Sequence, residues 1–423
     1  MLKGQGGVLF CLLLFFCGNS CGTSYGDTQT GEDGAFAAYY LGLKALAAAE
    51  DAEVSPDVKA DSSADSFDEA YRLFETALKS QNPYITAAAA EQLIPPLLRG
   101  EVSGWDKSPD KPPDLPLRPL HAAVLYQAGR YDEITPGADG AGDLLAQWDR
   151  IIPLVAQVAD VAGKAPSAFP DGLREEILGF LFDTAPGAPL RWAAQEIRRV
   201  APDLLSNAEN AVLEGRFAVA RSSFGAGLTL FRLALLDQPE LFLQYPSLIT
   251  DLGRSFQFTA SGTEGIDLFL EWAGTVAPPV HYRLLYFAGR IARARGAHKR
   301  SGELFTQALD FVPDELQADA CIWYIMDTAL QDAAGPAAIA LVKTWLPRWH
   351  DPAYFDDIMD RVSRSLASTG QWQRFPELLA LLDAAGSRVS RARYAYISGR
   401  AVAEGLIPLG GPDAGAGLPV DAS

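Results

Sequence analysis

The sequence predicts an all-α protein, arranged as an irregular α-solenoid in which pairs of short helices stack on one another. From Ala35 onward, apolar residues recur at helical spacing, and alternating apolar runs with turn signals are nearly absent. The best-defined pair of helices lies between Leu285 and Pro313. Two short helices of this kind cannot bury their apolar faces alone, so they need stacked neighbours.

The segment from Leu285 to Pro313 carries a pattern of small and aromatic residues on two helices. Small residues share one face of the first helix, a glycine interrupts the helix, and the second helix follows at steps of four and three. In chain order these residues are Ala288, Gly289, Ala292, Gly296, Ser301, Phe305 and Ala308, with Pro313 closing the pair. We expect the small side chains to let facing helices approach closely, and the phenylalanine to fill the space between neighbouring pairs.

The same pattern recurs with lower fidelity elsewhere in the chain. Residues 204–227 place Gly215, Ala220 and Phe224 at matching offsets, and the glycine there is interpreted as the turn between two helices. Further copies surround two more expected turn glycines, Gly129 and Gly370. The turns at 129, 215, 296 and 370 are not separated by multiples of 34, so we expect an irregular array with additional helices between the clear pairs.

Composition shifts predict the order of the parts along the chain. Residues 35–107 are expected to form an N-terminal helical unit, interrupted by an exposed acidic loop over 50–65. The proline-rich stretch 108–119 is expected to be a stiff connector, because five prolines in twelve residues disfavour a helix. The main superhelix then spans 120–405. It ends in the first helix of a further pair, and a disordered tail over 406–423 follows.

The N-terminus has the features of an export signal over residues 1–20. Lys3 gives a short positive start, and Val8–Phe16 is an apolar run too short to span a bilayer. Cys21 follows small and polar residues, an arrangement that resembles the lipobox of bacterial lipoproteins, with residues 21–34 as a flexible tether. Gly18 departs from the aliphatic residue usual in that motif, so ordinary cleavage and secretion, or an uncleaved anchor, remain the alternatives.

Charge and cysteine usage restrict the function further. The formal net charge of −18 disfavours binding to nucleic acids and anionic lipids, and solubility is its simplest interpretation. Cys321 lies in an apolar helical context and is expected to be buried and inert. The four histidines have no metal-ligand spacing, and no phosphate loop, GxSxG elbow or Cys–His arrangement occurs in the sequence. We therefore expect no metal, no cofactor and no catalytic residue.

One aromatic cluster is a candidate for ligand contact. Trp345, Trp349 and Tyr354 lie within ten residues of each other, and the two tryptophans are four positions apart. Exposed aromatic rings at helical spacing can hold a sugar ring or a peptide. Packing at a helix junction is the alternative interpretation, and Pro347 leaves the local geometry open.

Residues 282–313 resemble a tetratricopeptide repeat, with consensus residue types at Gly289, Phe305, Ala308 and Pro313, and residues 204–227 match at Ala220 and Phe224. That resemblance implies a superhelix whose concave face binds peptides or partner proteins. The overall layout is also similar to the N-terminal superhelical region of soluble lytic transglycosylases. The Glu-Ser, GLMQ-type and AYNAG-type catalytic motifs of that family are missing from this sequence, so no catalytic residue is carried over.

These observations predict a non-catalytic scaffold at the bacterial cell envelope, anchored by an N-terminal lipid on the periplasmic side of a membrane. Its partner is expected to be a protein or the peptidoglycan-processing machinery. The first alternative is a lytic-transglycosylase-like protein that retains only the superhelical region. The second is an accessory ligand-handling component of a transporter.

Overall fold

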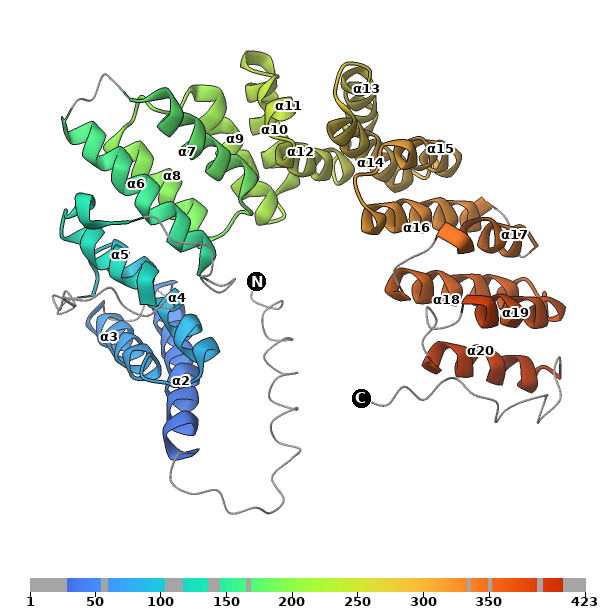
Figure 1. Cartoon of the computed structure of the whole chain (residues 1–423), viewed down its shortest axis with the longest axis horizontal. Helices are drawn as coiled ribbons and strands as arrows, with labels where there is room; N and C mark the ends of the chain where they lie inside the picture. The colour runs from blue at the N-terminus through green and yellow to red at the C-terminus, as the bar shows by residue number, and fades with distance from the viewer. Residues whose placement is uncertain are drawn as a thin grey trace. The chain divides into compact units, whose positions relative to one another are not determined.

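The computed structural model of this protein describes residues 29–54, 60–102, 117–135, 145–164, 169–332, 336–348, 352–385 and 391–405. Within these ranges the regular structure is entirely helical, without a strand (Figure 1). The prediction of an all-α fold is therefore confirmed. The expected signal segment 1–20, the lipidation candidate Cys21 and the tail 406–423 lie outside the described residues.

The chain divides into two compact units. The first comprises Met1–Leu173 and Ala188–Ala201, and the second comprises Arg174–Gly187 and Pro202–Ser423. The helices of the first unit are α2 (Gln29–Val54), α3 (Ala60–Ala77), α4 (Pro83–Leu98), α5 (Arg118–Gln127), the 3-10 turn η2 (Tyr131–Glu133), α6 (Ala146–Lys164) and α8 (Ala188–Val200).

The second unit takes most of α7 and all later helices. These are α7 (Asp171–Asp183), α9 (Asn207–Ala220), α10 (Phe224–Asp237), α11 (Leu241–Gln244), α12 (Ser247–Gln257), α13 (Gly262–Ala273), α14 (Pro278–Ala294), α15 (His298–Ala308), η3 (Leu309–Phe311), α16 (Glu315–Asp332), α17 (Pro336–Trp345), η4 (Leu346–Arg348), α18 (Pro352–Ser368), η5 (Trp372–Arg374), α19 (Phe375–Ala385) and α20 (Arg391–Ala403).

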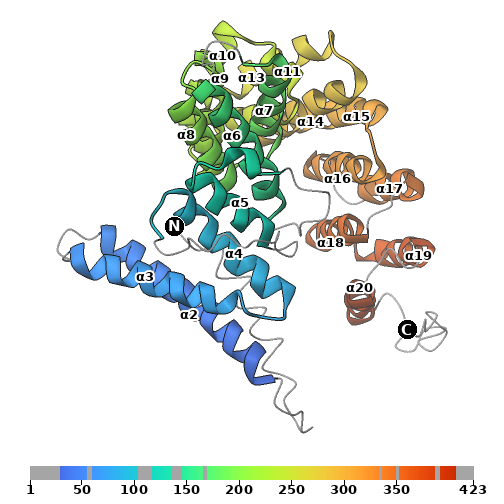
Figure 2. The same cartoon turned by 60° about the vertical axis from the view of Figure 1, so that its left-hand side comes forward.

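Two long helices, α2 and α3, occupy most of the segment expected to be a tether and an acidic loop. The first begins at Gln29 and continues to Val54, and the second begins at Ala60, so only 55–59 of the predicted loop 50–65 lie outside the described residues (Figure 2). The expected loop is wrong over the described part. Alanine and glutamate favour helix, and the two helices support each other because they pack together.

The proline-rich stretch does not separate the units as expected. Residues 108–116 of it lie outside the described residues, but α5 already begins at Arg118, with Pro119 in its first turn. Proline is tolerated there because the first N–H groups of a helix have no intrahelical partner. Since α5 packs on both α4 and α6, the residues from Leu117 to Leu173 belong with the N-terminal helices, and the predicted boundary is wrong.

Helices of the second unit contact the next helix and often the one after it. Neighbouring contacts join α9 to α10, α12 to α13 and on through α14, α15 and α16, while α10 meets α12, α12 meets α14, and α16 meets α18. The last described helix, α20, packs on α18 and α19 (Figure 1). The helix expected over 393–405 is therefore present as α20.

Several helices of the chain end in the same left-handed turn. Gly129, Gly296 and Gly370, three of the four expected turn glycines, have φ of +69°, +74° and +69°. After Gly296, Ala297 N donates to Ala292 O, and Gly296 N donates to Arg293 O. These two bonds are the Schellman pattern, which satisfies carbonyls that a helix end leaves without partners.

Gly215 is not a turn residue, contrary to the prediction. It lies inside α9, and a Cβ added there would come within 2.5 Å of the Phe231 ring. The left-handed position at the end of α9 is held by Ser222, with φ of +61°. Ser223 N donates to Ala218 O and Ser222 N to Val219 O, so this serine closes the same turn as Gly296.

The residues assigned to packing in this helix pair are consequently seven positions out of register. Ala220 is the exposed last residue of α9, and Phe224 is the half-buried first residue of α10. Phe231, fully buried, takes the place that Phe305 has in the other pair. We infer this because each phenylalanine follows its helix-interior glycine by sixteen positions, 215 to 231 and 289 to 305.

In α14 and α15, a glycine and a phenylalanine of the predicted pattern meet. Phe305 and Ala308 are fully buried, and a Cβ on Gly289 would come within 3.0 Å of the Phe305 ring. Ser301 Oγ donates to Gly289 O at 2.9 Å, so the second helix lies directly against the backbone of the first. Pro313 follows the 3-10 turn η3 and precedes α16, where a proline ends the pair without disturbing a helix.

Candidate functional site

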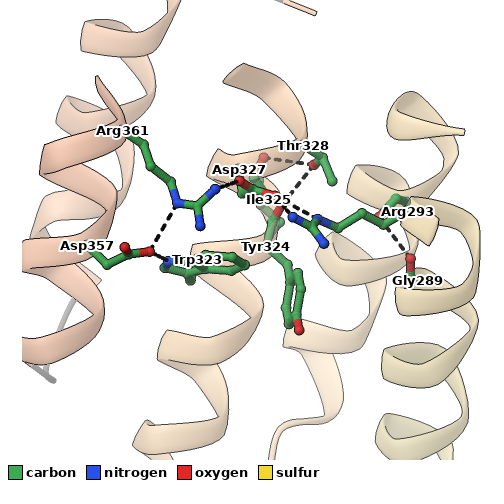
Figure 3. A network of polar contacts seen from close by, with 10 residues as sticks. Gly289, Arg293, Trp323, Tyr324, Ile325, Asp327, Thr328, Asp357 and Arg361 are labelled. Carbon is green, nitrogen blue, oxygen red and sulfur yellow. Dashed lines mark hydrogen bonds and ion pairs between the residues drawn. The ribbon is translucent and has the colours of Figure 1, made fainter. Parts of the chain in front are cut away.

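A row of charged and aromatic side chains crosses α14, α16 and α18 (Figure 3). We call it the arginine ladder and define it as Arg293, Trp323, Asp327, Asp357 and Arg361. Arg293 on α14 and Arg361 on α18 both bind Asp327 on α16, with closest N–O distances of 2.6 Å on either side. Asp357 accepts hydrogen bonds from Arg361 Nε at 3.1 Å and from Trp323 Nε1 at 2.8 Å. One hydrogen-bonded system thus joins three helices.

The ladder depends on a spacing of 34 residues along the chain. Arg293, Asp327 and Arg361 follow one another at that interval, and Trp323 and Asp357 are also 34 apart. One α-helix lies between α14 and α16 in the chain, and one between α16 and α18. Residues separated by one such helix pair therefore meet across neighbouring helices.

Burial within the ladder is asymmetric. The Asp327 side chain is 1% exposed, whereas the side chains of Arg293 and Arg361 remain 34% and 35% exposed. A buried carboxylate needs charged or hydrogen-bonding partners to offset the loss of water. Two guanidinium groups supply them here, and each still presents an open side to solvent. The ladder is therefore a fixed structural element with an accessible outer surface.

Aromatic rings lie beneath and beside the guanidinium groups. The Arg361 guanidinium is 4.7 Å from the centre of the Trp323 ring, and that of Arg293 is 5.6 Å from Tyr324. Tyr324 in turn stacks on the buried Phe305 ring at 4.6 Å, with the planes 5° apart. Stacking of this kind holds arginine side chains flat and restricts their rotamers.

Arg290, one turn before Arg293 on α14, has an unusual environment. Its guanidinium lies between Tyr286 and Phe287, at 5.8 and 5.3 Å from the ring centres. Its Nε atom is buried and has no hydrogen-bond partner among the described residues. Buried polar atoms are nearly always hydrogen-bonded, so this donor is one of the exceptions among the described residues.

Cys321 and Tyr282 lie under this surface and are chemically quiet. Cys321 is fully buried, as predicted, and burial raises its thiol pKa to about 12. Burial also raises the pKa of Tyr282 and of Tyr286 above the usual tyrosine value. All three groups are therefore neutral at physiological pH, so they add no charge to the surface and offer no thiolate nucleophile.

A second polar network, in α7, α9 and α12, serves packing. Arg216 is 2% exposed; its Nε donates to Asp251 Oδ2 at 2.9 Å, and its other nitrogens donate to the carbonyls of Leu181 and Thr184. Burial raises the pKa of Asp251, and the neighbouring Arg216 guanidinium opposes this. Since both charges are buried, this pair joins helices and exposes little to a ligand.

Neither network was predicted from the sequence. Arg216 stands in the apolar run AVLEGRFAVA, and a charge in such a run can signal a buried pair. For the ladder, the signal is the recurrence of Arg, Asp and Arg at 293, 327 and 361. The regularity appears when charged residues, rather than small ones, are compared at an interval of 34 positions.

The aromatic cluster predicted for ligand contact is only partly described. Trp345 ends α17 and is half-buried, with the Arg348 guanidinium 5.4 Å from its ring centre. Trp349 lies outside the described residues. Tyr354 lies in the first turn of α18, where only the backbone is described. Two of the three side chains thus lie outside what the structure describes, and the cluster stays a prediction.

The described ranges hold neither a metal cluster nor a membrane-spanning helix. No group of three or more His, Cys, Asp or Glu side chains within them is placed to hold a metal ion. No helix in the described parts of the chain is long and apolar enough to cross a membrane. No protein-family model, no curated protein and no solved structure matches this chain. The arginine ladder with Tyr286, Arg290 and Tyr324 is accordingly the site to which we assign a function.

Proposed function

We propose that the second unit is an irregular α-solenoid of tetratricopeptide-like helix pairs, and that the arginine ladder is the surface on which it binds a partner protein. The chain is then a non-catalytic scaffold. On sequence grounds alone we place it at the bacterial cell envelope, exported and held on the periplasmic side of a membrane by a lipid on Cys21.

The observation that carries the proposal is the composition of this surface. Arginine, tryptophan and tyrosine are the residue types most enriched among the residues that dominate protein–protein binding energy. Arg290, Arg293 and Arg361 are held by stacking or ion pairs, so binding would immobilise little additional side-chain freedom. These three arginines and the two carboxylates of Asp327 and Asp357 give the surface a net charge of +1. The chain as a whole has a net charge of −18.

The partner segment expected here is extended and offers hydrogen-bond acceptors. Three neighbouring helices present the ladder, so a segment crossing from α14 to α18 would meet Arg293 and then Arg361 (Figure 3). A carboxylate or a backbone carbonyl beside Arg290 would accept hydrogen bonds from its guanidinium. The solenoid arrangement is supported by the contacts between alternate helices and by the contacts 34 residues apart.

Site-specific photocrosslinking of the full-length chain in intact cells tests this proposal. The photoreactive amino acid p-benzoylphenylalanine replaces Tyr286, whose ring it resembles in shape. We expect a discrete protein adduct at this position. The matched control places the same group at Leu236 on α10, which is 86% exposed and lies away from the ladder in sequence. Adding Arg293→Gln and Arg361→Gln, with Asp327→Asn so that no buried charge is left unpaired, should lower the yield at position 286 about tenfold, because the charge-assisted contacts are lost.

Three outcomes separate the alternatives. Equal adducts at positions 286 and 236, or a yield at 286 that ignores the arginine substitutions, would contradict a binding role for the ladder. Adducts to glycan strands, together with sedimentation with peptidoglycan, would favour the transglycosylase-like alternative. Release of muropeptides by the purified chain would contradict the hypothesis that the chain is a non-catalytic scaffold.

A further inference from the structure

A cavity of about 430 Å³ opens in the second unit between α18, the 3-10 turn η5 and α20. Its apolar lining includes Ala367, Trp372, Phe375 and Tyr396, and its charged lining includes Arg364 and Arg400. Small-molecule sites are concave, mostly apolar and furnished with few polar groups, and this volume lies in their usual range. None of these residues belongs to the arginine ladder.

The apolar part of the cavity is built by aromatic rings from three elements, η5, α19 and α20. Phe375 is 1% exposed and lies 5.2 Å from Trp372, ring centre to ring centre. Tyr396 on α20 is 48% exposed, although it is a large aromatic residue. An exposed ring beside a buried one provides a place where a flat apolar group could be covered on two sides.

The two arginines differ in how closely an acidic side chain approaches their guanidinium groups. Arg364 forms an ion pair with Asp360, one turn earlier on α18, at 2.6 Å. Arg400 is 3.8 Å from Glu404, too far for a hydrogen bond. Its guanidinium lies 4.9 Å from the centre of the Trp372 ring, which holds it in place. Since Tyr396 and Arg400 are four residues apart on α20, they share one side of that helix.

A held guanidinium with open N–H groups matches the two oxygens of a carboxylate. We propose that this cavity binds a small carboxylic acid with a flat apolar body, its carboxylate on Arg400 and its body between Trp372, Phe375 and Tyr396. A neutral sugar fits less well, because Arg400 already occupies a face of the indole on which the sugar would stack. This proposal is independent of the partner surface on α14, α16 and α18.

Calorimetric titration of the full-length chain with 3-phenylpropionate, and with its uncharged analogue 3-phenylpropanamide, tests the proposal. The two probes have nearly the same shape and differ in charge. We expect the acid to bind at least tenfold more tightly than the amide. Arg400→Gln should remove this preference, and Tyr396→Ala should lower the affinity for both probes. Arg374→Gln is the matched control, because Arg374 pairs with Glu377 at 2.9 Å and does not line the cavity.

Two results would overturn the proposal. One is equal affinity of the unaltered chain for acid and amide, including no detectable binding of either. The other is a preference for the acid that survives Arg400→Gln. Should Arg400→Gln unfold α20, Arg400→Lys replaces it: lysine keeps the charge but loses the two-pronged geometry. Acid affinity should then fall several-fold at an unchanged melting temperature, and full retention would contradict the assigned role.

Discussion

The helix pairs α9–α10 and α14–α15 follow the same plan and differ at their turns. In each pair a helix-interior glycine, Gly215 or Gly289, faces a fully buried phenylalanine sixteen positions later. The turn between the helices has Ser222 in one pair and Gly296 in the other, both with left-handed φ. The comparison teaches that the close contact between glycine and aromatic ring sets the register of a pair, whereas a glycine in the turn can be replaced.

A third pair, α2–α3, supports the same rule in the other unit. A Cβ on Gly42 would come within 2.8 Å of the Phe74 ring, and Ala70, Phe74 and Ala77 are fully buried. Here 32 positions separate glycine and phenylalanine, and the additional sixteen correspond to the length of the segment 50–65. The helices of this pair are longer, and the close approach of glycine and phenylalanine is the same.

The largest effect is expected from removing the buried ring. Phe231→Ala should lower the free energy of unfolding by about 3–5 kcal/mol, as should Phe305→Ala, because each leaves a cavity at a close helix contact. Phe224→Ala should cost about 1 kcal/mol, since that ring is half-buried and mainly stacks on Phe258 at 4.6 Å. Urea unfolding followed by circular dichroism measures all three. Equal losses for Phe224 and Phe231 would contradict the corrected register.

A smaller difference in the free energy of unfolding is expected between the alanine variants of the two glycines. Gly215→Ala puts a Cβ 2.5 Å from the Phe231 ring, and overpacking of this kind costs about 1–3 kcal/mol. Gly289→Ala meets the Phe305 ring only at 3.0 Å. There the gain of about 1 kcal/mol in helix propensity should offset most of the cost. The same urea titration should therefore rank Gly215→Ala as the less stable variant, and a reversed order would show that the first pair is not the tighter one.

The smallest effect concerns the turn. Ser222→Gly should stabilise the chain by about 0.5–1 kcal/mol, because left-handed φ costs an L-residue more than glycine loses in backbone entropy. Gly296→Ser should destabilise it by a similar amount. Shifts in melting temperature measured by calorimetry would detect both. If Ser222→Gly were destabilising, the serine would have to contribute a contact of its own at this turn.

The sequence predicts the helical fold and the best pair because their signals are local. Small residues at Gly289 and Ser301 and the ring of Phe305 lie within one repeat, where spacing can be checked directly. The register of 204–227 was misassigned because Gly215 was interpreted as a turn, while the actual turn residue, Ser222, has no sequence signature for left-handed φ.

The candidate site was less predictable than the fold. Arg293, Asp327 and Arg361 are separated by a whole helix pair, so their contact depends on how neighbouring pairs stack. Each side chain alone is typical of a solvated helix face. The cavity beside Arg400 likewise arises from the packing of rings that come from η5, α19 and α20.

Asp327 belongs to two helix interfaces at once, through its ion pairs with Arg293 and Arg361. Opening α18 away from α16 would remove one of the two positive charges that compensate this buried carboxylate. The ion pair with Arg293 would then be the only one left to offset the free-energy cost of burying it. Detachment at one interface therefore weakens the other. In an array whose pairs otherwise interact only with their neighbours, this shared residue should make α14 to α18 unfold as one cooperative block rather than fray helix by helix.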